Sequence, residues 1–278
     1  MFDPQVHLKI AEQRLGYCPE TNHPWTLNEF CLARLLACHT DLVLQEALAR
    51  GADKLTCKFY PPAGPVKVPA LHAIYPDIDW KMLHYPVVMK PSHGSGLYQV
   101  IHELPGPFEQ AELAARAALW LRTAAQKDAP FKPYYERIPP RVFVEEYVTD
   151  PTDYKIFVCS GRAVMIQVIA GRGAGPLKVS HCTSQGEWLD MDYHIPNSQR
   201  VQARDLSAEV REMLLYVAEE VVASVGGPAR DFVRVDLYYS GGEVFFGELD
   251  WAPGHYGVRK IEPYDVDRWL GSYIKPLF

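Results

Sequence analysis

The chain has 278 residues, of which 48% are hydrophobic and 22% are charged, so it can bury a sizeable core and is not compositionally disordered. Its 34 acidic and 28 basic residues give a net charge of -6, and the absence of Lys/Arg clusters argues against nucleic acid as the main partner. The first twenty residues lack a basic segment followed by an apolar stretch, and no apolar run in the chain is long enough for a transmembrane segment, so the protein is expected to be cytoplasmic. The six scattered cysteines are expected to be free thiols.

The first sixty residues have a helical pattern. Thr26–Glu29 has the composition of a capping box ahead of an apolar run that ends at Leu36. A second helix is predicted from Asp41 to Arg50, and it is expected to end at Gly51. The proline-rich cluster that begins at Tyr60 then breaks the helical pattern and indicates a boundary between residues 60 and 80.

Beyond residue 86 the pattern becomes that of short strands and two long helices. The periodicity predicts helices at 108–125 and 206–225, and strands at 86–90, 97–101, 142–147, 154–158, 163–170, 177–182, 232–239 and 243–249. Ser240-Gly-Gly242 is expected to join the last two strands as a hairpin. The fold class is therefore α+β, with mostly antiparallel strands on one side and helices on the other.

Acidic residues gather on the two strands of this hairpin. Residues two apart on a strand point to the same face, so pairing would bring Arg234 and Asp236 together with Glu248 and Asp250. Three carboxylates in one place usually need a cation, and oxygen ligands of this kind suit Mg²⁺ or Mn²⁺ carrying phosphates. A solvated acidic face with surface salt bridges is the alternative that these residues leave open.

A lysine and a glycine-rich loop follow the first predicted strand after residue 80. An ammonium group suits phosphate, and glycines let backbone N–H groups approach phosphate oxygens closely. Lys90 precedes the glycines, so the segment is not a Walker A loop, and an ordinary hairpin turn is the alternative. The residues of the loop are Ser92, His93, Gly94, Ser95 and Gly96.

Two further segments carry candidate polar contacts. Glu145 or Glu146, at a strand end, could accept hydrogen bonds from an adenine amino group or a ribose hydroxyl, although charged residues are also common on edge strands. Lys155 and Arg172 lie on neighbouring predicted strands and form a candidate pair for an anionic substrate or phosphate.

In their order along the chain, these segments resemble the ATP-grasp superfamily and, within it, the TupA-like group associated with teichuronopeptide and other surface-polysaccharide biosynthesis. The resemblance covers roughly residues 55–275, and Ala52-Asp-Lys54 and Asp267-Arg-Trp-Leu-Gly271 are also similar. The segments that carry it are Pro86–Gly96, Val144–Val148, Asp153–Phe157, Arg234–Asp236 and Phe246–Gly254. It implies two α+β subdomains that grip ATP, a small one at 81–147 with the glycine-rich loop and a large one at 148–278 with a metal site, preceded by a short helical region at 1–80.

The resemblance also implies nucleotide-binding roles. Lys90 would hold the α- and β-phosphates, with residues 92–96 as the loop that closes over them. The adenine hinge would consist of Glu145, Glu146, Tyr147 and Val148, and Asp153 would bind the ribose.

The remaining implied roles concern the metal and the reacting groups. Asp236 and Glu248 would ligate Mg²⁺, and Arg234 would steady the transferred phosphoryl group, while Lys155 and Arg172 would face phosphate or the acyl substrate. Asp250 stands where many ATP-grasp enzymes have Asn, and it is predicted as a third metal ligand.

The resemblance implies an enzyme, an ADP-forming carboxylate–amine ligase that uses ATP with Mg²⁺ or Mn²⁺. Its substrates would be a small-molecule or glycan carboxylate and an amine acceptor, in surface-polysaccharide or secondary-metabolite biosynthesis. A phosphotransferase on a hydroxyl acceptor and a non-catalytic ATP-binding module of a polysaccharide-synthesis complex are the alternatives. Neither the substrates nor the oligomeric state follow from the sequence.

Overall fold

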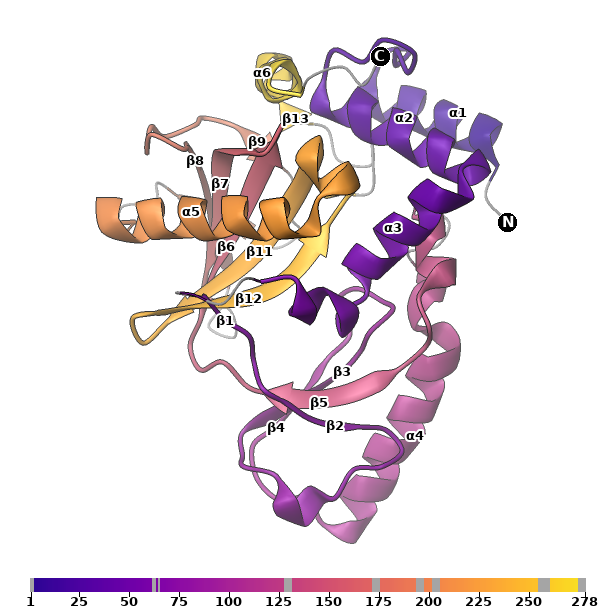
Figure 1. Ribbon diagram of the computed structural model, residues 1–278, viewed down its shortest axis with the longest axis vertical. Helices are drawn as coiled ribbons and strands as arrows, with labels where there is room; N and C mark the ends of the chain where they lie inside the picture. The colour runs from indigo at the N-terminus through magenta and orange to yellow at the C-terminus, as the bar shows by residue number, and fades with distance from the viewer. Residues whose placement is uncertain are drawn as a thin grey trace.

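Two β-sheets form the framework of the protein, one of seven strands and one of four (Figure 1). The computed structural model describes residues 3–61, 64, 66–127, 132–171, 176–193, 198–201, 206–254 and 261–274. Figure 1 shows the larger sheet in the upper half of the view and the smaller sheet below it, with α4 (Pro107–Thr123) running beside the smaller sheet.

The larger sheet is antiparallel through its centre, and its edge strands β1 and β10 are parallel to their neighbours. Its strands, in spatial order, are β1 (Val66–Lys67), β12 (Glu243–Asp250), β11 (Phe232–Ser240), β6 (Thr152–Cys159), β7 (Arg162–Ala170), β8 (Leu177–Thr183) and β10 (Ser198–Arg200). Gly241 and Gly242 connect β11 to β12 with φ of 59° and 85°. Two successive positive φ angles are typical of the tight turns that join hairpin strands, and glycine adopts them without steric cost.

The smaller sheet is antiparallel throughout, in the order β2 (Leu71–Ile74), β5 (Val142–Glu146), β3 (Val87–Pro91) and β4 (Gln99–Ile101). One of its faces packs on α4 through a buried cluster that includes Trp120, Val87 and Met89. Burial of this cluster removes apolar surface from water and fixes α4 on the sheet. A separate two-stranded ladder joins β9 (Asp192–Tyr193) to β13 (Ile261–Glu262).

Helices cover both faces of the larger sheet. The apolar stripe of α5 (Ala208–Val225) packs on one face, and α1 (Pro4–Leu15), α2 (Leu27–Thr40) and α6 (Tyr264–Ser272) cover the end of the other face where Phe157, Met165 and Phe232 lie. The helix α3 (Leu42–Ala52) packs beside β12. Short 3₁₀ helices complete the chain: η1 (Thr56–Phe59), η2 (Trp80–Met82), η3 (Ala124–Lys127), η4 (Pro133–Arg137) and η5 (Gly227–Arg230).

Every strand and helix predicted beyond residue 86 is present, within two residues of its predicted bounds. The capping box before α2 is also confirmed, because the Thr26 hydroxyl accepts from the Glu29 backbone and the Glu29 carboxylate accepts from the Thr26 backbone. The pattern did not indicate β1, β2 or α6. Both short strands lie in the proline-rich segment, and the division of the chain at residue 80 stays a prediction.

The helix predicted from Asp41 to Arg50 is present as α3, but Gly51 does not end it, because the helix continues to Ala52. Gly51 is required by packing instead: a Cβ atom at this position would lie 2.2 Å from Cζ2 of Trp251. The Trp251 ring is buried, and its Nε1 donates a hydrogen bond to the Leu48 carbonyl at 2.8 Å, one turn earlier on the same helix. Gly51 therefore leaves room for the Trp251 ring to pack against α3, and it does not end the helix.

All six cysteines are free thiols, as expected. Five are buried, and Cys31 donates to the Trp251 carbonyl with its Sγ at 3.9 Å. Within the described ranges, none of the helices combines the length and the apolar character that crossing a membrane requires.

A single carboxylate ties α6 to the first turn of α2. Asp267 accepts hydrogen bonds from the Asn28 backbone N–H at 3.1 Å and from Asn28 Nδ2 at 2.8 Å, and it is 2% exposed. The amides of the first helical turn have no partner within their own helix. Asp267 therefore caps α2 from a position 239 residues further along the chain.

Asp267 should make the stability of the protein depend on pH. Burial raises the pKa of this carboxyl from 3.8 to about 6, so the folded state binds the proton more tightly than the unfolded state. The contribution of Asp267 to the free energy of unfolding is therefore largest at acidic pH and declines as the pH rises through about 6. Asp267→Asn stays neutral, and we expect it to gain about 2–3 kcal/mol relative to the wild type between pH 4 and pH 7 in urea unfolding.

Asp265→Asn is the matched control for this experiment, because Asp265 lies exposed in the same helical turn. Its free energy of unfolding should follow the wild type at every pH. A difference between wild type and Asp267→Asn that stays constant from pH 4 to pH 7 would contradict the proposed titration.

Candidate functional site

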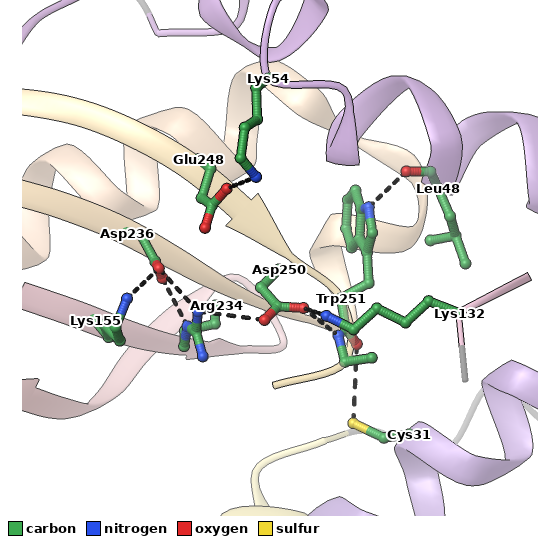
Figure 2. Close-up of polar contacts among 11 residues, drawn as sticks. Cys31, Leu48, Lys54, Lys132, Lys155, Arg234, Asp236, Glu248, Asp250 and Trp251 are labelled. Atoms are coloured by element: carbon green, nitrogen blue, oxygen red, sulfur yellow. Dashed lines mark hydrogen bonds and ion pairs between the residues drawn. The ribbon is translucent and has the colours of Figure 1, made fainter. Parts of the chain in front are cut away.

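The β11–β12 hairpin brings four charged side chains to one face of the larger sheet. Arg234 lies directly opposite Asp250, and Asp236 lies directly opposite Glu248 (Figure 2). This is the pairing that the two-residue spacing predicts. A solvated acidic face does not describe Asp236, which is 1% exposed, and all three carboxylates form ion pairs with cations.

Asp236 is held by two cations. Arg234 donates from Nε to Oδ1 at 2.6 Å and from its terminal nitrogen to Oδ2 at 2.8 Å, and Lys155 forms an ion pair with Oδ2. The fork-shaped, two-bond contact fixes the plane of the guanidinium group. Arg234 is therefore a rigid positive group at the centre of the hairpin face.

Asp250 and Glu248 have cations of their own. Asp250 Oδ1 accepts from Lys132 Nζ at 2.7 Å and from the Ala252 backbone at 3.0 Å, and Oδ2 lies 3.2 Å from Arg234. Glu248 forms an ion pair with Lys54. Burial favours the protonated forms, but Lys132 and Arg234 hold the pKa of Asp250 well below its usual range, and Lys54 lowers the pKa of Glu248 to about 2. Both carboxylates therefore stay ionised at neutral pH.

A row of polar side chains continues from this hairpin across the sheet. The register places them directly opposite one another on five neighbouring strands, in the order Glu248, Asp236, Lys155, Gln167 and His181. The last two are buried, with 2.8 Å between Gln167 Nε2 and His181 Nε2. Burial, with a smaller effect of Arg200, lowers the pKa of His181 to about 4. The far end of the row is therefore neutral at physiological pH.

The smaller sheet carries a second charged cluster. Lys90 on β3 forms an ion pair with Oε1 of Glu145 on β5, and Lys58 on η1 lies with its Nζ 2.6 Å from Oε2. Both ammonium groups also lie over the ring of Phe143, at 5.5 Å for Lys90 and 6.0 Å for Lys58. Glu145 is 3% exposed, so its carboxylate depends on these two cations rather than on water.

Only part of the glycine-rich loop is accessible. Ser92 is buried, and its Oγ donates a hydrogen bond to the Pro139 carbonyl at 3.2 Å. The same Oγ accepts a hydrogen bond from the Arg141 backbone N–H at 3.3 Å. His93 is buried as well, and a Cβ at Gly94 would lie 2.6 Å from the Ala124 carbonyl oxygen. The first three residues therefore anchor the loop. Ser95 is partly exposed and Gly96, with φ of 69°, is exposed.

The other predicted nucleotide contacts lie at the ends of β5 and β6. Glu146 accepts from the Ala70 backbone at 3.1 Å, and the Tyr147 ring packs edge-on against His102. Val148 is partly exposed in the segment that leads from β5 to β6.

Asp153 and Arg172 complete the predicted set. Asp153 is buried on β6, two residues before Lys155 and therefore on the same face of the sheet. Arg172 lies outside the described residues.

A short stretch of chain links the two sheets. We call Asp53–Lys58 the bridging segment. Asp53 forms an ion pair with Arg141, and the Lys54 backbone N–H donates a hydrogen bond to the Ser92 carbonyl at 3.1 Å. Both contacts lie beside the smaller sheet. The Lys54 side chain extends to Glu248 on the larger sheet. The bridging segment therefore joins the glycine-rich loop to the acidic hairpin.

The two clusters together carry an excess of positive charge. Their carboxylates are Glu145, Asp236, Glu248 and Asp250, and their cations are Lys54, Lys58, Lys90, Lys132, Lys155 and Arg234. Six cations against four carboxylates leave the ion-paired groups with two positive charges in excess, and the buried Asp153, on the same face of the sheet as Lys155, offsets one of them. The remaining positive charge suits a polyanionic ligand.

The acidic residues fit a metal ion that arrives with a ligand. In the part of the chain that the structure describes, no group of three or more His, Cys, Asp or Glu side chains is placed to hold a metal by itself. Magnesium commonly takes one or two carboxylates and completes its octahedron with water and substrate phosphates. Asp236 and Glu248 lie directly opposite each other and supply two such carboxylates. Asp236 and Asp250 each receive three donors, and Glu248 pairs with Lys54.

Lys54, Lys58 and Lys132 were not predicted as site residues. Lys54 stands in the Ala52–Lys54 triplet, which was a usable signal. Lys58 and Lys132 belong to no recognisable motif, and Lys132 lies 118 residues before its partner Asp250. Contacts at such separation depend on tertiary structure and leave no local pattern.

A family model described as TupA-like ATPgrasp matches residues 63–275. No curated protein sequence matches the chain significantly. Among solved structures, the chain is similar to an L-amino acid ligase from Bacillus licheniformis (13% identity, 77% of this chain and 43% of that chain, TM-score 0.48). It is also similar to a D-alanine–D-alanine ligase from Bacillus anthracis complexed with ATP (14% identity, 75% of this chain and 56% of that chain, TM-score 0.44). A D-alanine–D-alanine ligase from Helicobacter pylori is similar as well (15% identity, 81% of this chain and 61% of that chain, TM-score 0.46). The chain thus spans 43% to 61% of the lengths of these enzymes.

Proposed function

The chain belongs to the TupA-like ATP-grasp family, and from this membership we propose that it is an ATP- and Mg-dependent carboxylate–amine ligase. The reaction forms an amide bond through an acyl phosphate and releases ADP and phosphate. The substrates we propose are a small-molecule or glycan carboxylate and an amine, in surface-polysaccharide or secondary-metabolite biosynthesis.

The observation that carries this proposal is the net positive site shared by the two sheets. A magnesium-bound triphosphate is still an anion, so a group with more lysine and arginine than carboxylate can hold it. The bridging segment links the phosphate-binding candidates around Lys90 to the metal-binding candidates Asp236 and Glu248. A ligand that spans both clusters is the simplest occupant of such a site.

Within this proposal, Lys90 and the exposed residues of the loop, Ser95 and Gly96, bind the phosphates, while Ser92, His93 and Gly94 anchor the loop. The adenine hinge comprises residues 145–148, and Asp153 binds the ribose. Asp236 and Glu248 hold Mg²⁺, with Asp250 retained as a third candidate. Bound there, the ion neutralises charge on the phosphoryl oxygens that react.

The protein's own groups mainly position the substrates and compensate charge. A carboxylate oxygen of the substrate attacks the γ-phosphorus, the bond to ADP breaks, and an acyl phosphate results. A neutral amine then attacks the acyl carbon, phosphate leaves, and the amine proton is lost to solvent. Arg234, held in one plane by Asp236, offers a fixed positive charge to the developing negative oxygens, and Lys155 and Arg172 are proposed to orient the acyl substrate.

The test is a product analysis with ATP, Mg²⁺ and a panel of carboxylate and amine pairs. We expect ADP and free phosphate in equal amounts, and amide product only when both substrates are present. Hydroxylamine in place of the amine should trap the acyl phosphate as a hydroxamate. ADP with a phosphorylated hydroxyl acceptor and no free phosphate would show a phosphotransferase instead, and ATP binding without acceptor-dependent turnover would show a non-catalytic module.

A further inference from the structure

Lys58 is a buried cation to which the proposed mechanism gives no individual role. It reaches Glu145 from η1, at the end of the bridging segment, and shares this one carboxylate with Lys90. The two lysines bind different oxygens, Oε2 and Oε1. Both ammonium groups also lie over the same ring, that of Phe143.

One carboxylate and two ammonium groups leave this trio with one positive charge in excess. A buried carboxylate needs at least one cation nearby, because isolated charge is costly away from water. The side chain of Glu145 is 3% exposed, that of Lys58 is 7% exposed and that of Lys90 is 15% exposed. Lys90 is thus the more accessible of the two cations, and it is also the one that leads into the glycine-rich loop.

We propose that Lys58 is the counter-ion that frees Lys90 for phosphate. Without nucleotide, both lysines share Glu145. When a nucleoside di- or triphosphate binds, Lys90 turns to the phosphates, and Lys58 alone keeps the buried carboxylate compensated. Lys58 is therefore a positioning residue that acts through Glu145 and Lys90. This inference rests on the proposed nucleotide site and extends it to the bridging segment.

Removal of Lys58 should reveal this role through a selective loss of affinity. In Lys58→Met, Lys90 is the remaining partner of Glu145 in the trio, so phosphate binding must break that ion pair. We expect the affinity for ADP and ATP with Mg²⁺ to fall about 10- to 100-fold in isothermal titration calorimetry. Adenosine has no phosphate and should bind Lys58→Met as it binds the wild type.

A second substitution sharpens the test. Glu145→Gln in the Lys58→Met background removes the carboxylate that would retain Lys90, so ADP affinity should recover to within about threefold of the Glu145→Gln single variant. Lys58→Arg keeps the charge and should also retain ADP affinity. Lys67→Met is the matched control, because Lys67 forms a 2.5 Å ion pair with Glu243 on the exposed end of the larger sheet.

The outcomes separate this role from a structural one. An equal loss for adenosine and ADP in Lys58→Met, or no recovery in the double variant, would overturn the proposal. Thermal unfolding checks that the variants fold. If Lys58→Met does not fold, the comparison of the double variant with the Glu145→Gln single variant tests the proposal. Wild-type protein that binds neither ADP nor ATP would instead overturn the proposed function, whereas wild-type binding with an unaffected Lys58→Met would overturn the role of Lys58 alone.

Discussion

Glu248→Gln is expected to reduce Mg-dependent ADP formation by about 10³-fold or more, and Asp236→Asn should do the same. Each amide keeps the shape of the side chain and removes the charge that a magnesium ion requires. Glu248→Gln also replaces the ion pair between Glu248 and Lys54 by a contact between Lys54 and a neutral amide. The rate should be measured by coupled detection of ADP across a range of Mg²⁺ concentrations.

The two variants should differ in stability. Asp236 is buried and compensates both Arg234 and Lys155. Its neutralisation removes the carboxylate that pairs with Lys155 and leaves Arg234 with Asp250, which should cost about 3–5 kcal/mol of unfolding free energy. Glu248 is partly exposed, and a smaller loss is expected. Glu248→Gln is therefore the cleaner test of metal binding.

Glu243→Gln provides the control on the same strand. Glu243 is exposed at the start of β12, beside the turn and five residues before Glu248, and it pairs with Lys67 rather than with a cation of the two clusters. Its activity should equal that of the wild type. Full activity in both Glu248→Gln and Asp236→Asn would disprove the metal site.

Arg234→Lys is expected to lower kcat by about 10²-fold or more while the KM for ATP changes little. Arginine at this position binds Asp236 through two parallel hydrogen bonds and also approaches Asp250. A lysine ammonium is a point charge and cannot reproduce the planar fork, so charge is kept and orientation is lost. Steady-state kinetics with ATP and the carboxylate each varied in turn would separate this effect from weaker binding.

Arg162→Lys is the corresponding control, because Arg162 is exposed at the start of β7. It should leave both constants unchanged. If Arg234→Lys raised the KM for ATP and kept kcat, Arg234 would be a nucleotide-binding residue rather than one that acts on the transferred phosphoryl group.

Much of the fold was predictable because its longer elements carry strong local patterns. The alternation on β11 and β12, the two glycines between them and the apolar stripe of α5 each indicate their structure without reference to the rest of the chain. The strands β1 and β2 have two and four residues, and each pairs with a strand far along the sequence. Their pairing is decided by tertiary contacts, which a local pattern cannot show.

The candidate site was predictable for its carboxylates and less so for its cations. Asp236, Glu248 and Asp250 stand two residues from another charged residue on a strand, and this spacing places them on one face. Lys58 and Lys132 reach the site from 3₁₀ and connecting segments that have no such period. The glycine-rich loop shows the same limit, because its sequence suits phosphate along its whole length while tertiary packing buries its first three residues.

The bridging segment also means that the boundary of the family match and the boundary of the candidate site do not coincide. The family match begins at residue 63 and includes every strand of the two sheets, yet Lys54 and Lys58 precede it. A fragment or chimera cut at residue 63 would keep both sheets and lose two of the six cations, together with the contacts that tie the loop to the hairpin. Transfer of this site to another protein therefore requires the chain from α3 onward.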